Sequence, residues 1–219
     1  MPVFFQHQES NTPLILWEAV EDESFFKEAL PSTVFDTMPT HAEKRKQYLS
    51  GRFLLQQLDP NFPYEQLRIA TGGRPYLADS SAQFSISHAG TYIAAILHPS
   101  SQVGVDVEQI TERAHRIRKK FLSPEEEEIL KSLLLFSNEE DVSHAYTLAW
   151  SVKETAFKAL HQSGVDFIRD LPIQQIDPVQ GGWSIKIGGK GMGMNLAARF
   201  IETLCLSWTV IAKKVESRK

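Results

Sequence analysis

The side-chain alternation of residues 103–108 constrains the fold of this chain more than any other feature of its sequence. In Val-Gly-Val-Asp-Val-Glu the valines occupy every second position, and Asp106 and Glu108 occupy two of the positions between them. Successive side chains of a strand point to opposite faces. We therefore expect a strand that buries its valines against a core and places Asp106 and Glu108 side by side on the opposite, exposed face.

Helix signals lie on both sides of this strand. We expect helices over residues 40–58, 123–136 and 138–162. The first two begin with a hydroxyl residue followed three positions later by Glu, at Thr40 and Ser123, which is the spacing of a capping box. A proline directly after Ser123 strengthens the second start, and a glycine two residues beyond position 162 ends the third helix.

Further strands are predicted in both halves of the chain. Residues 84–87 and 92–97 form a pair around a turn at 88–90, and residues 183–187, 194–201 and 204–212 form an antiparallel meander. The glycine-rich stretch 188–193 lacks the spacing of a phosphate-binding loop, so we expect a hairpin turn there. Because each half mixes helix with sheet, the predicted fold class is α+β.

Composition excludes several classes of protein. With 219 residues, 42% of them hydrophobic and 23% charged, the chain can form a core without metals or disulfides, and its single cysteine, Cys205, is expected to be buried. A net charge of −4 argues against nucleic acid and anionic membranes as partners. No apolar run is long enough to span a membrane and no signal peptide is evident, so we expect a soluble, cytoplasmic protein.

A second carboxylate position lies on the third predicted helix. Helical spacing stacks Trp150, Glu154 and Lys158 on one face. Together with Asp106 and Glu108, Glu154 would supply oxygen ligands of the kind that Mg²⁺ prefers. Taken singly, the strand is equally explained by a solvated acidic face, and the helix by an ordinary Glu-to-Lys pair.

Candidate phosphate ligands lie in the first half of the chain. Residues 71–76 form a glycine turn that carries Arg74, whose guanidinium suits a phosphate. Ser87 and His88, at the end of a predicted strand, would be exposed together and could bind phosphate. A Ser-His nucleophile is disfavoured, because the chain has no G-x-S-x-G elbow.

Four segments in this order resemble the signature series of the 4′-phosphopantetheinyl transferase superfamily, in its long single-chain type. They are residues 73–75, 84–88, 104–108 and 150–158, and the resemblance spans about residues 40–165. It implies two similar α+β halves, residues 1–102 and 103–219, related by a pseudo-twofold axis with one coenzyme A site between them. Because one chain would supply both halves, a monomer is expected.

The resemblance also implies a reaction and its residues. The phosphopantetheine arm of coenzyme A, the co-substrate, would move to a serine of an apo carrier protein, with Mg²⁺ on the pyrophosphate. Asp106, Glu108 and Glu154 would hold the metal, and Asp106, Glu154 and Lys158 would be catalytic. The serine proton would pass to Glu154 or to a metal-bound water oriented by Glu108. Residues implied in coenzyme binding are Arg45, Arg52, Arg74, Pro75, Ser87, His88, Asp106, Lys153, Glu154 and Lys158.

Two positions depart from the family pattern. Ala89 stands where the family usually has Ser or Thr, and Ser85 where Asn is frequent, which puts one or two hydrogen bonds to the coenzyme in doubt. A metal-dependent phosphohydrolase or nuclease, and a non-catalytic coenzyme A or carrier-protein binding module, stay open as alternatives. For the carrier, we expect a basic and partly apolar docking surface made of Arg113, Arg116, Arg118, Lys119, Lys120 and Phe121.

Overall fold

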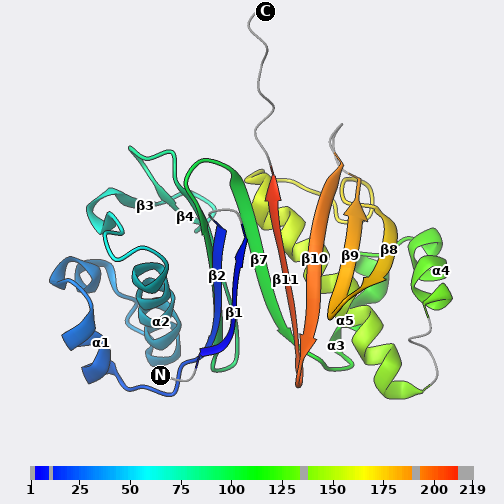
Figure 1. Ribbon diagram of the computed structural model, residues 1–219, viewed down its shortest axis with the longest axis horizontal. Coiled ribbons are helices and arrows are strands. Elements are labelled where there is room, and N and C mark those ends of the chain that lie inside the picture. The colour runs from blue at the N-terminus through cyan, green and yellow to red at the C-terminus, as the bar shows by residue number, and fades with distance from the viewer. Residues whose placement is uncertain (1–2, 10–11, 134–137, 189–192, 212–219) are drawn as a thin grey trace, which may run out of the picture. The chain divides into compact units, whose positions relative to one another are not determined.

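The computed structural model describes residues 3–9, 12–133, 138–188 and 193–211, and these divide into two compact units (Figure 1). The first unit extends to Val103, and the second comprises Gly104–Ile211. Both combine helices with a sheet, so the predicted α+β class is confirmed. The predicted pseudo-twofold relation between the halves stays a prediction.

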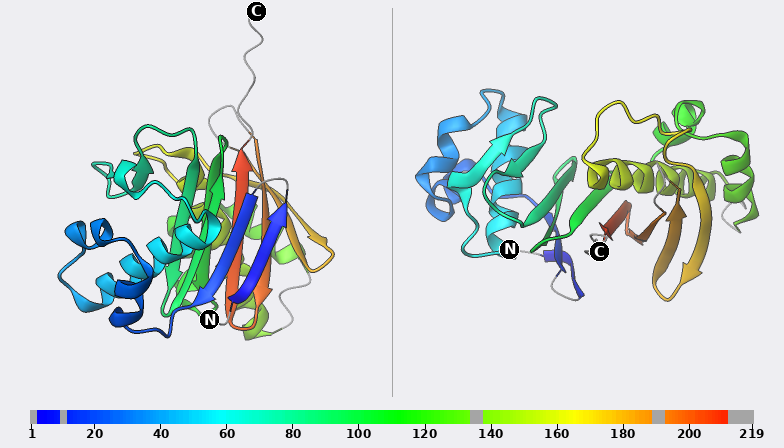
Figure 2. Two further views of the ribbon diagram at one scale, coloured as in Figure 1. Left: turned by 60° about the vertical axis from the view of Figure 1, so that its left-hand side comes forward. Right: turned by 90° about the horizontal axis from the view of Figure 1, so that it is seen from above.

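The first unit is built on a four-stranded sheet in the order β1-β2-β6-β5. Neighbouring strands are antiparallel throughout this sheet. Helix α2 packs against β6, β2 and β5, and Figure 2 shows it along one face of the sheet. The elements of this unit are β1 (Val3–Glu9), β2 (Thr12–Glu18), α1 (Glu23–Ala29), η1 (Ser32–Thr37), α2 (Ala42–Leu58), η2 (Tyr64–Gln66), β3 (Leu67–Ile69), β4 (Pro75–Leu77), β5 (Gln83–Ala89) and β6 (Tyr92–His98).

Aromatic side chains form the centre of the first core. Trp17 of β2 packs against Phe53 of α2 with ring centroids 5.3 Å apart, and Phe26 of α1 meets both rings. All three side chains are buried. Burial of aromatic rings of this size therefore fixes α1 and α2 on the sheet.

The predicted helix over residues 40–58 is confirmed, but its predicted capping box is wrong. Helix α2 begins at Ala42, and its N-cap is His41, which makes no side-chain cap. Thr40 thus lies one position too early to cap, and its carbonyl oxygen instead accepts a hydrogen bond from Arg45 at 2.6 Å. The predicted strand pair is also confirmed, although β5 continues through His88 and Ala89, which we had expected in the turn.

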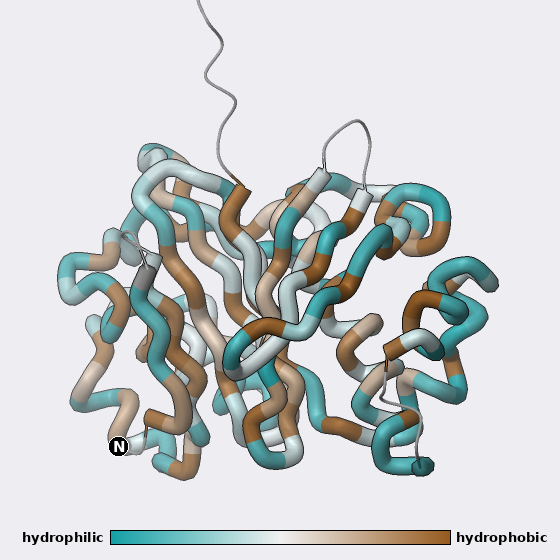
Figure 3. Tube along the Cα trace, turned by 45° about the vertical axis from the view of Figure 1, so that its right-hand side comes forward, coloured by the Kyte–Doolittle hydropathy of each residue, from teal (hydrophilic) through white to brown (hydrophobic). Residues whose placement is uncertain are grey.

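The second unit is built on a five-stranded sheet in the order β7-β11-β10-β9-β8. Helix α5 packs against β11, β10 and β9 and crosses one face of this sheet (Figure 1). The strands of this sheet carry both hydrophobic and hydrophilic positions, without strict alternation (Figure 3). The elements are β7 (Gln102–Gln109), α3 (Arg113–Ile117), η3 (Arg118–Lys120), α4 (Pro124–Ser132), α5 (Glu139–Leu160), β8 (Ile173–Val179), β9 (Gly182–Ile187), β10 (Met194–Ile201) and β11 (Leu204–Ile211).

The caps of α4 and α5 explain where these helices begin. Ser123 and Glu126 form the predicted capping box of α4, and the amide oxygen of Asn138 accepts from the backbone N–H of Asp141 at 2.9 Å in α5. Helix α4 ends at Ser132, before the predicted position 136, and residues 134–137 lie outside the described ranges. Helix α5 ends at Leu160, because the next residue adopts a left-handed conformation.

The C-terminal meander is confirmed, and it gains one strand that we did not predict. Strand β8 contains Pro178, which an edge strand tolerates because the missing N–H does not interrupt the sheet. Cys205 of β11 is buried as expected. Most of the predicted turn at 188–193 lies outside the described residues. No helix in the described ranges is both long and apolar enough to cross a membrane.

Candidate active site

The close approach of β7 to α5 builds the candidate site in the second unit. Gly104 makes this approach possible, because a Cβ atom at this position would lie 2.2 Å from the carbonyl oxygen of Thr155 and 3.1 Å from the Cβ of Ala159. The first contact is shorter than Cβ atoms in proteins make, and the second is tighter than most of their contacts. The glycine therefore lets the strand pass directly against the helix that carries Glu154 and Lys158.

Asp106 is paired with the helix across this contact. The ammonium group of Lys158 donates to Asp106 Oδ1 at 2.7 Å and to the carbonyl oxygen of Val105 at 3.2 Å. The expectation that Asp106 lies on an exposed face is wrong, since the residue is only 3% exposed. Residues 103–107 are all buried, so β7 is covered on both faces.

Glu108 is held by an indole. Trp150 Nε1 donates to Glu108 Oε1 at 2.8 Å, and the carboxylate is half-buried. Burial raises the pKa of Glu108, and the negative charge of Asp106 raises it further, while the Trp150 hydrogen bond opposes the change. The contact with Trp150 thus fixes the orientation of a carboxylate whose charge is poorly solvated.

Glu154 completes a carboxylate cluster, a name we use for Asp106, Glu108 and Glu154. The pKa of Glu154 is raised from its ordinary 4.5 to about 7, mainly by burial and next by the negative charge of Asp106. The positive charge of Lys158 opposes the rise in pKa, and the negative charge of Glu108 adds to it. The three carboxylates therefore share one electrostatic environment, in which the Lys158 ammonium and, for Glu108, the Arg113 guanidinium offset part of the negative charge. The charges of Asp106, Glu108 and Lys158 all act on Glu154, which places the four groups in one region of the second unit.

The chemistry of these donors fits a hard divalent cation. Carboxylate oxygens are the usual protein ligands of Mg²⁺, and a cation would relieve the repulsion that raises the Glu154 pKa. Over the described ranges, however, no group of three or more His, Cys, Asp or Glu side chains is arranged to hold a metal ion. Instead, Lys158 and Trp150 each hold one oxygen of the cluster. The ligand set therefore stays a prediction.

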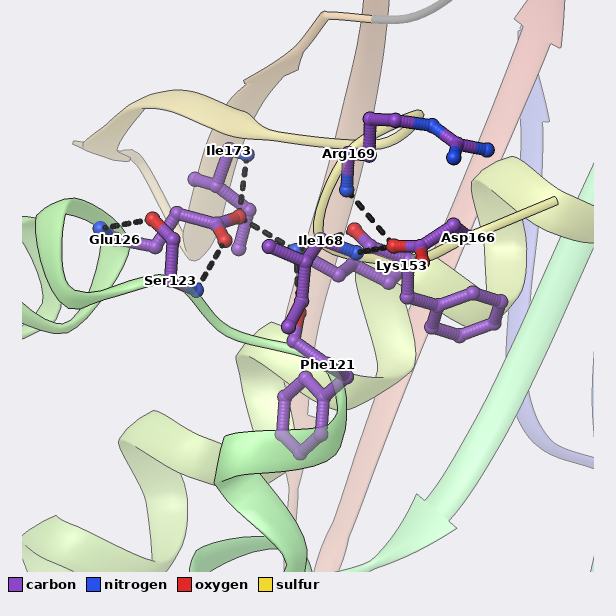
Figure 4. Close-up of polar contacts among 9 residues, drawn as sticks. Phe121, Ser123, Glu126, Lys153, Asp166, Ile168, Arg169 and Ile173 are labelled. Carbon is purple, nitrogen blue, oxygen red and sulfur yellow. Dashed lines mark hydrogen bonds and ion pairs between the residues drawn. The ribbon is translucent and has the colours of Figure 1, made fainter.

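Lys153, which we expected to contact the coenzyme, lies elsewhere. Its side chain is fully buried and forms an ion pair with Glu126 (Figure 4). Its ammonium also donates to the backbone carbonyls of Phe121 at 2.6 Å and Phe167 at 2.8 Å. These partners satisfy all three donors of the ammonium. This placement argues against a coenzyme contact, and we assign Lys153 a structural role.

The basic residues predicted to bind coenzyme phosphates lie in the first unit. Arg45 and Arg52 project from α2 two turns apart. Arg45 pairs with Glu23 at 3.2 Å. Arg52 is only 7% exposed, and its guanidinium lies 3.8 Å from the ring centre of Tyr48. Its Nε has no hydrogen-bond partner among the described residues, so an anion would satisfy a buried N–H.

The remaining predicted coenzyme contacts also lie in this unit. Arg74 precedes β4 in the turn after β3, and burial lowers its pKa. Pro75 begins β4, opposite Ile69. Ser87 and His88 are neighbours on β5 and therefore point to opposite faces, with Ser87 buried and His88 exposed. The expectation that these two side chains are exposed together is wrong.

Only part of the segment that we predicted to dock the carrier protein is exposed. Phe121 belongs to the core, where its ring lies 5.1 Å from that of Trp150. Arg116 pairs with Glu112 at 2.6 Å. Lys119 and Lys120 remain exposed in η3. Phe121 is therefore removed from the predicted docking surface, because the bulky ring that we expected at the surface is needed to fill the core.

Two functional features were missed in the sequence. One is the hydrogen bond from Trp150 to Glu108, and the other is the need for Gly104 at the crossing of β7 and α5. The helical spacing of Trp150 and Glu154 was a usable signal for the first, since it placed the indole on the face of the site. No sequence pattern reports the second, because it depends on how near the two elements lie.

Comparison with known proteins places the same part of the chain in one family. Residues 102–210 match the model of the 4′-phosphopantetheinyl transferase superfamily. Over 116 residues, the chain is 30% identical to a Haemophilus influenzae protein named "Putative 4′-phosphopantetheinyl transferase". This similarity covers 50% of the chain and 47% of that protein, so the match spans about half of each.

Proposed function

Since the chain belongs, through residues 102–210, to the 4′-phosphopantetheinyl transferase superfamily, we propose that it transfers the phosphopantetheine group of coenzyme A to a serine of an apo carrier protein. The observation that carries the proposal is the carboxylate cluster with Lys158, which lies within the matched residues. Such a site suits phosphoryl-group transfer, where catalysis comes from positioning reactants and stabilising charge.

The reaction exchanges one phosphorus–oxygen bond for another. The serine Oγ forms a bond to the β-phosphorus of coenzyme A, and the bond to the bridging pyrophosphate oxygen breaks. Adenosine 3′,5′-bisphosphate leaves with the electron pair, and the serine proton passes to a base. That base is either Glu154 or a water oriented by Glu108. The Lys158 ammonium, held by Asp106, would stabilise negative charge on the pyrophosphate.

Asp106, Glu108 and Glu154 would hold the divalent ion of this family. When bound, Mg²⁺ would neutralise charge on the pyrophosphate oxygens. In this proposal Trp150 keeps Glu108 oriented toward the cluster, since its indole donates to one oxygen and leaves the other available. Asp106 forms an ion pair with Lys158, and this pair holds the ammonium beside the cluster.

For the coenzyme phosphates we propose residues of the first unit, with Arg52 as the main contact. Its buried guanidinium has an Nε–H without a partner among the described residues, and an anion would compensate both charge and donor. Arg45, Arg74, Pro75, Ser87 and His88 are proposed as further contacts. We expect Arg52→Ala to weaken coenzyme A binding in calorimetry and the exposed control Arg68→Ala to leave it unchanged. Equal affinities for both variants would remove Arg52 from the site.

The proposed reaction is tested by intact mass. The protein is incubated with coenzyme A, Mg²⁺ and an apo carrier protein, and the carrier should gain one phosphopantetheine group. Lys158→Ala and Glu154→Gln should abolish the gain, whereas Lys131→Ala, which removes an exposed ion pair in α4, should not. Coenzyme A cleavage without carrier modification would instead indicate a phosphohydrolase. Binding without either reaction would indicate a non-catalytic module.

We further propose that a cytoplasmic monomer performs the reaction and that the carrier docks on the exposed basic residues of the segment 113–120. Lys119 and Lys120 are the best placed of them, because both are exposed. Steering by such charges mainly speeds association. Charge reversal of both lysines should raise the KM for the carrier and leave coenzyme A affinity unchanged. An unaltered carrier KM would remove this segment from the docking surface.

A further inference from the structure

A buried lysine network connects three segments of the second unit. We use this name for Lys153 and Glu126 with the carbonyl groups of Phe121 (Figure 4) and Phe167. The side chains of Lys153 and Glu126 are 0% and 2% exposed. Removing either charge alone would leave the other buried without its partner, which proteins tolerate poorly. The stabilities of the two buried charges are therefore coupled.

The acidic member of the network is saturated with donors. Besides Lys153, Glu126 accepts from the backbone N–H of Ile173 at 2.7 Å and of Ser123 at 2.8 Å. These bonds join the start of β8 and the turn before α4 to helix α5. Through Phe167, the same network holds the connection between α5 and β8. Lys153 thus fixes the backbone on two sides of its own helix.

The residues fixed by these carbonyls are the ones that enclose Trp150. The Phe121 ring lies 5.1 Å from the Trp150 ring at an interplanar angle of 71°, and the Phe167 ring lies 5.7 Å away at 36°. Trp150 in turn donates to Glu108 at 2.8 Å. A continuous series of contacts therefore leads from the buried ion pair to one carboxylate of the cluster.

We propose that Lys153 and Glu126 are positioning residues for Glu108. They hold Phe121 and Phe167 in place, the two rings clamp the indole of Trp150, and the indole fixes the carboxylate for the divalent ion. The step to the ion rests on the proposed function, while the step to the indole does not. Hydrogen-bond partners that orient metal ligands typically change metal affinity by 10–100-fold when removed.

Three variants separate positioning from simple stability. Trp150→Phe removes the indole N–H and keeps an aromatic ring between Phe121 and Phe167. Lys153→Met removes the ammonium and keeps a side chain of similar length. Leu196→Ala shortens a buried side chain of β10 in the same core without touching the network, so it is the stability control. Thermal unfolding would be measured for all of them.

Two quantities are then measured, both at a temperature well below the lowest Tm of these proteins. The first is the hydrogen exchange of the Trp150 indole N–H by NMR, assigned through its loss in Trp150→Phe. The second is Mn²⁺ affinity, measured by electron paramagnetic resonance with coenzyme A present. Lys153→Met should speed exchange at least about tenfold, and Lys153→Met and Trp150→Phe should each weaken Mn²⁺ binding about 10–100-fold. Leu196→Ala should change neither.

The double variant of Lys153 and Trp150 gives the sharpest comparison. If both residues act on Glu108 through one series of contacts, Lys153→Met should weaken Mn²⁺ binding little further once Trp150 is Phe. Fully additive losses, or indole exchange in Lys153→Met equal to that in Leu196→Ala, would overturn the positioning role. Absence of Mn²⁺ binding in the unaltered protein would contradict the proposed metal site, and the indole exchange would still decide the role of Lys153.

Discussion

Replacing Gly104 by alanine tests whether the contact between β7 and α5 builds the carboxylate cluster. The added Cβ would lie 2.2 Å from the Thr155 carbonyl oxygen, whereas ordinary contacts begin at 3.4 Å. A backbone carbonyl inside a helix cannot rotate away, so the strand must move by roughly 1 Å. We therefore expect β7 to shift away from α5 and to carry Asp106 with it.

The size of the effect follows from two contributions. Overpacking of a well-packed core costs typically about 1–3 kcal/mol. The shift would also lengthen the bond of 2.7 Å from Lys158 to Asp106 beyond hydrogen-bonding range, and hydrogen bonds of charged groups contribute about 1.5–3 kcal/mol. We therefore expect Gly104→Ala to lower the free energy of unfolding by about 3–5 kcal/mol and to abolish the proposed phosphopantetheine transfer.

Urea unfolding with a matched glycine measures this loss. At an m value of about 2 kcal/mol/M, a loss of about 3–5 kcal/mol moves the unfolding midpoint by about 1.5–2.5 M. Gly72→Ala is the control, since nothing lies within 4 Å of its added Cβ, and we expect a change below about 0.5 kcal/mol. If Gly104→Ala unfolded at the same urea concentration as Gly72→Ala, the close approach would not be needed for the site.

Three further changes have defined outcomes. With chelator present, the free energy of unfolding should fall as pH rises from about 4.5 through 7, because Glu154 binds its proton more tightly in the folded state. The pKa shift corresponds to about 3 kcal/mol, and partial exposure of the side chain lowers the expected loss to about 1–2 kcal/mol. An equally steep pH profile in Glu154→Gln would contradict this. Ser123→Ala should cost about 1 kcal/mol in thermal unfolding by removing the cap of α4, and an unchanged Tm would argue against it. Burial lowers the pKa of His98, whose Nδ1 accepts hydrogen bonds from two backbone N–H groups. The stabilising effect of the neutral imidazole is therefore present above pH 6.5 and is lost as pH falls through the pKa of the folded state. His98→Ala should flatten the acid side of the plot of stability against pH, and an unchanged plot would contradict this.

Local signals predicted much of the secondary structure, and tertiary contacts explain where they failed. The capping box of Ser123 is present because every group that forms it lies within four residues. Thr40 has the same spacing with Glu43, yet α2 starts after it. Strand β8 escaped prediction because its Pro178 is acceptable only at a sheet edge, and edges are set by strand order rather than by sequence.

The sequence indicated which acids share a face of β7 and which residues share a face of α5, but not the environment of each side chain. Alternation in β7 correctly placed Asp106 and Glu108 on one face, and helical spacing correctly placed Trp150 near Glu154. Exposure of Asp106 was predicted wrongly, because alternation reports two faces and cannot tell whether the second is also covered. The burial of Lys153 depends on Glu126, which precedes it by 27 residues, so no local pattern could indicate that pair.

In the proposed function, the carboxylate cluster would link stability to cation binding. Burial, together with repulsion from Asp106 and Glu108 that Lys158 offsets only in part, raises the pKa of Glu154 to about 7. At neutral pH the folded chain therefore keeps these acids close at a cost in free energy that the unfolded chain does not bear. A ligand that binds only the folded state repays such a cost by mass action. Divalent ions should consequently stabilise the protein more at pH 8 than at pH 5, because protonation of Glu154 removes both the repulsion and one ligand.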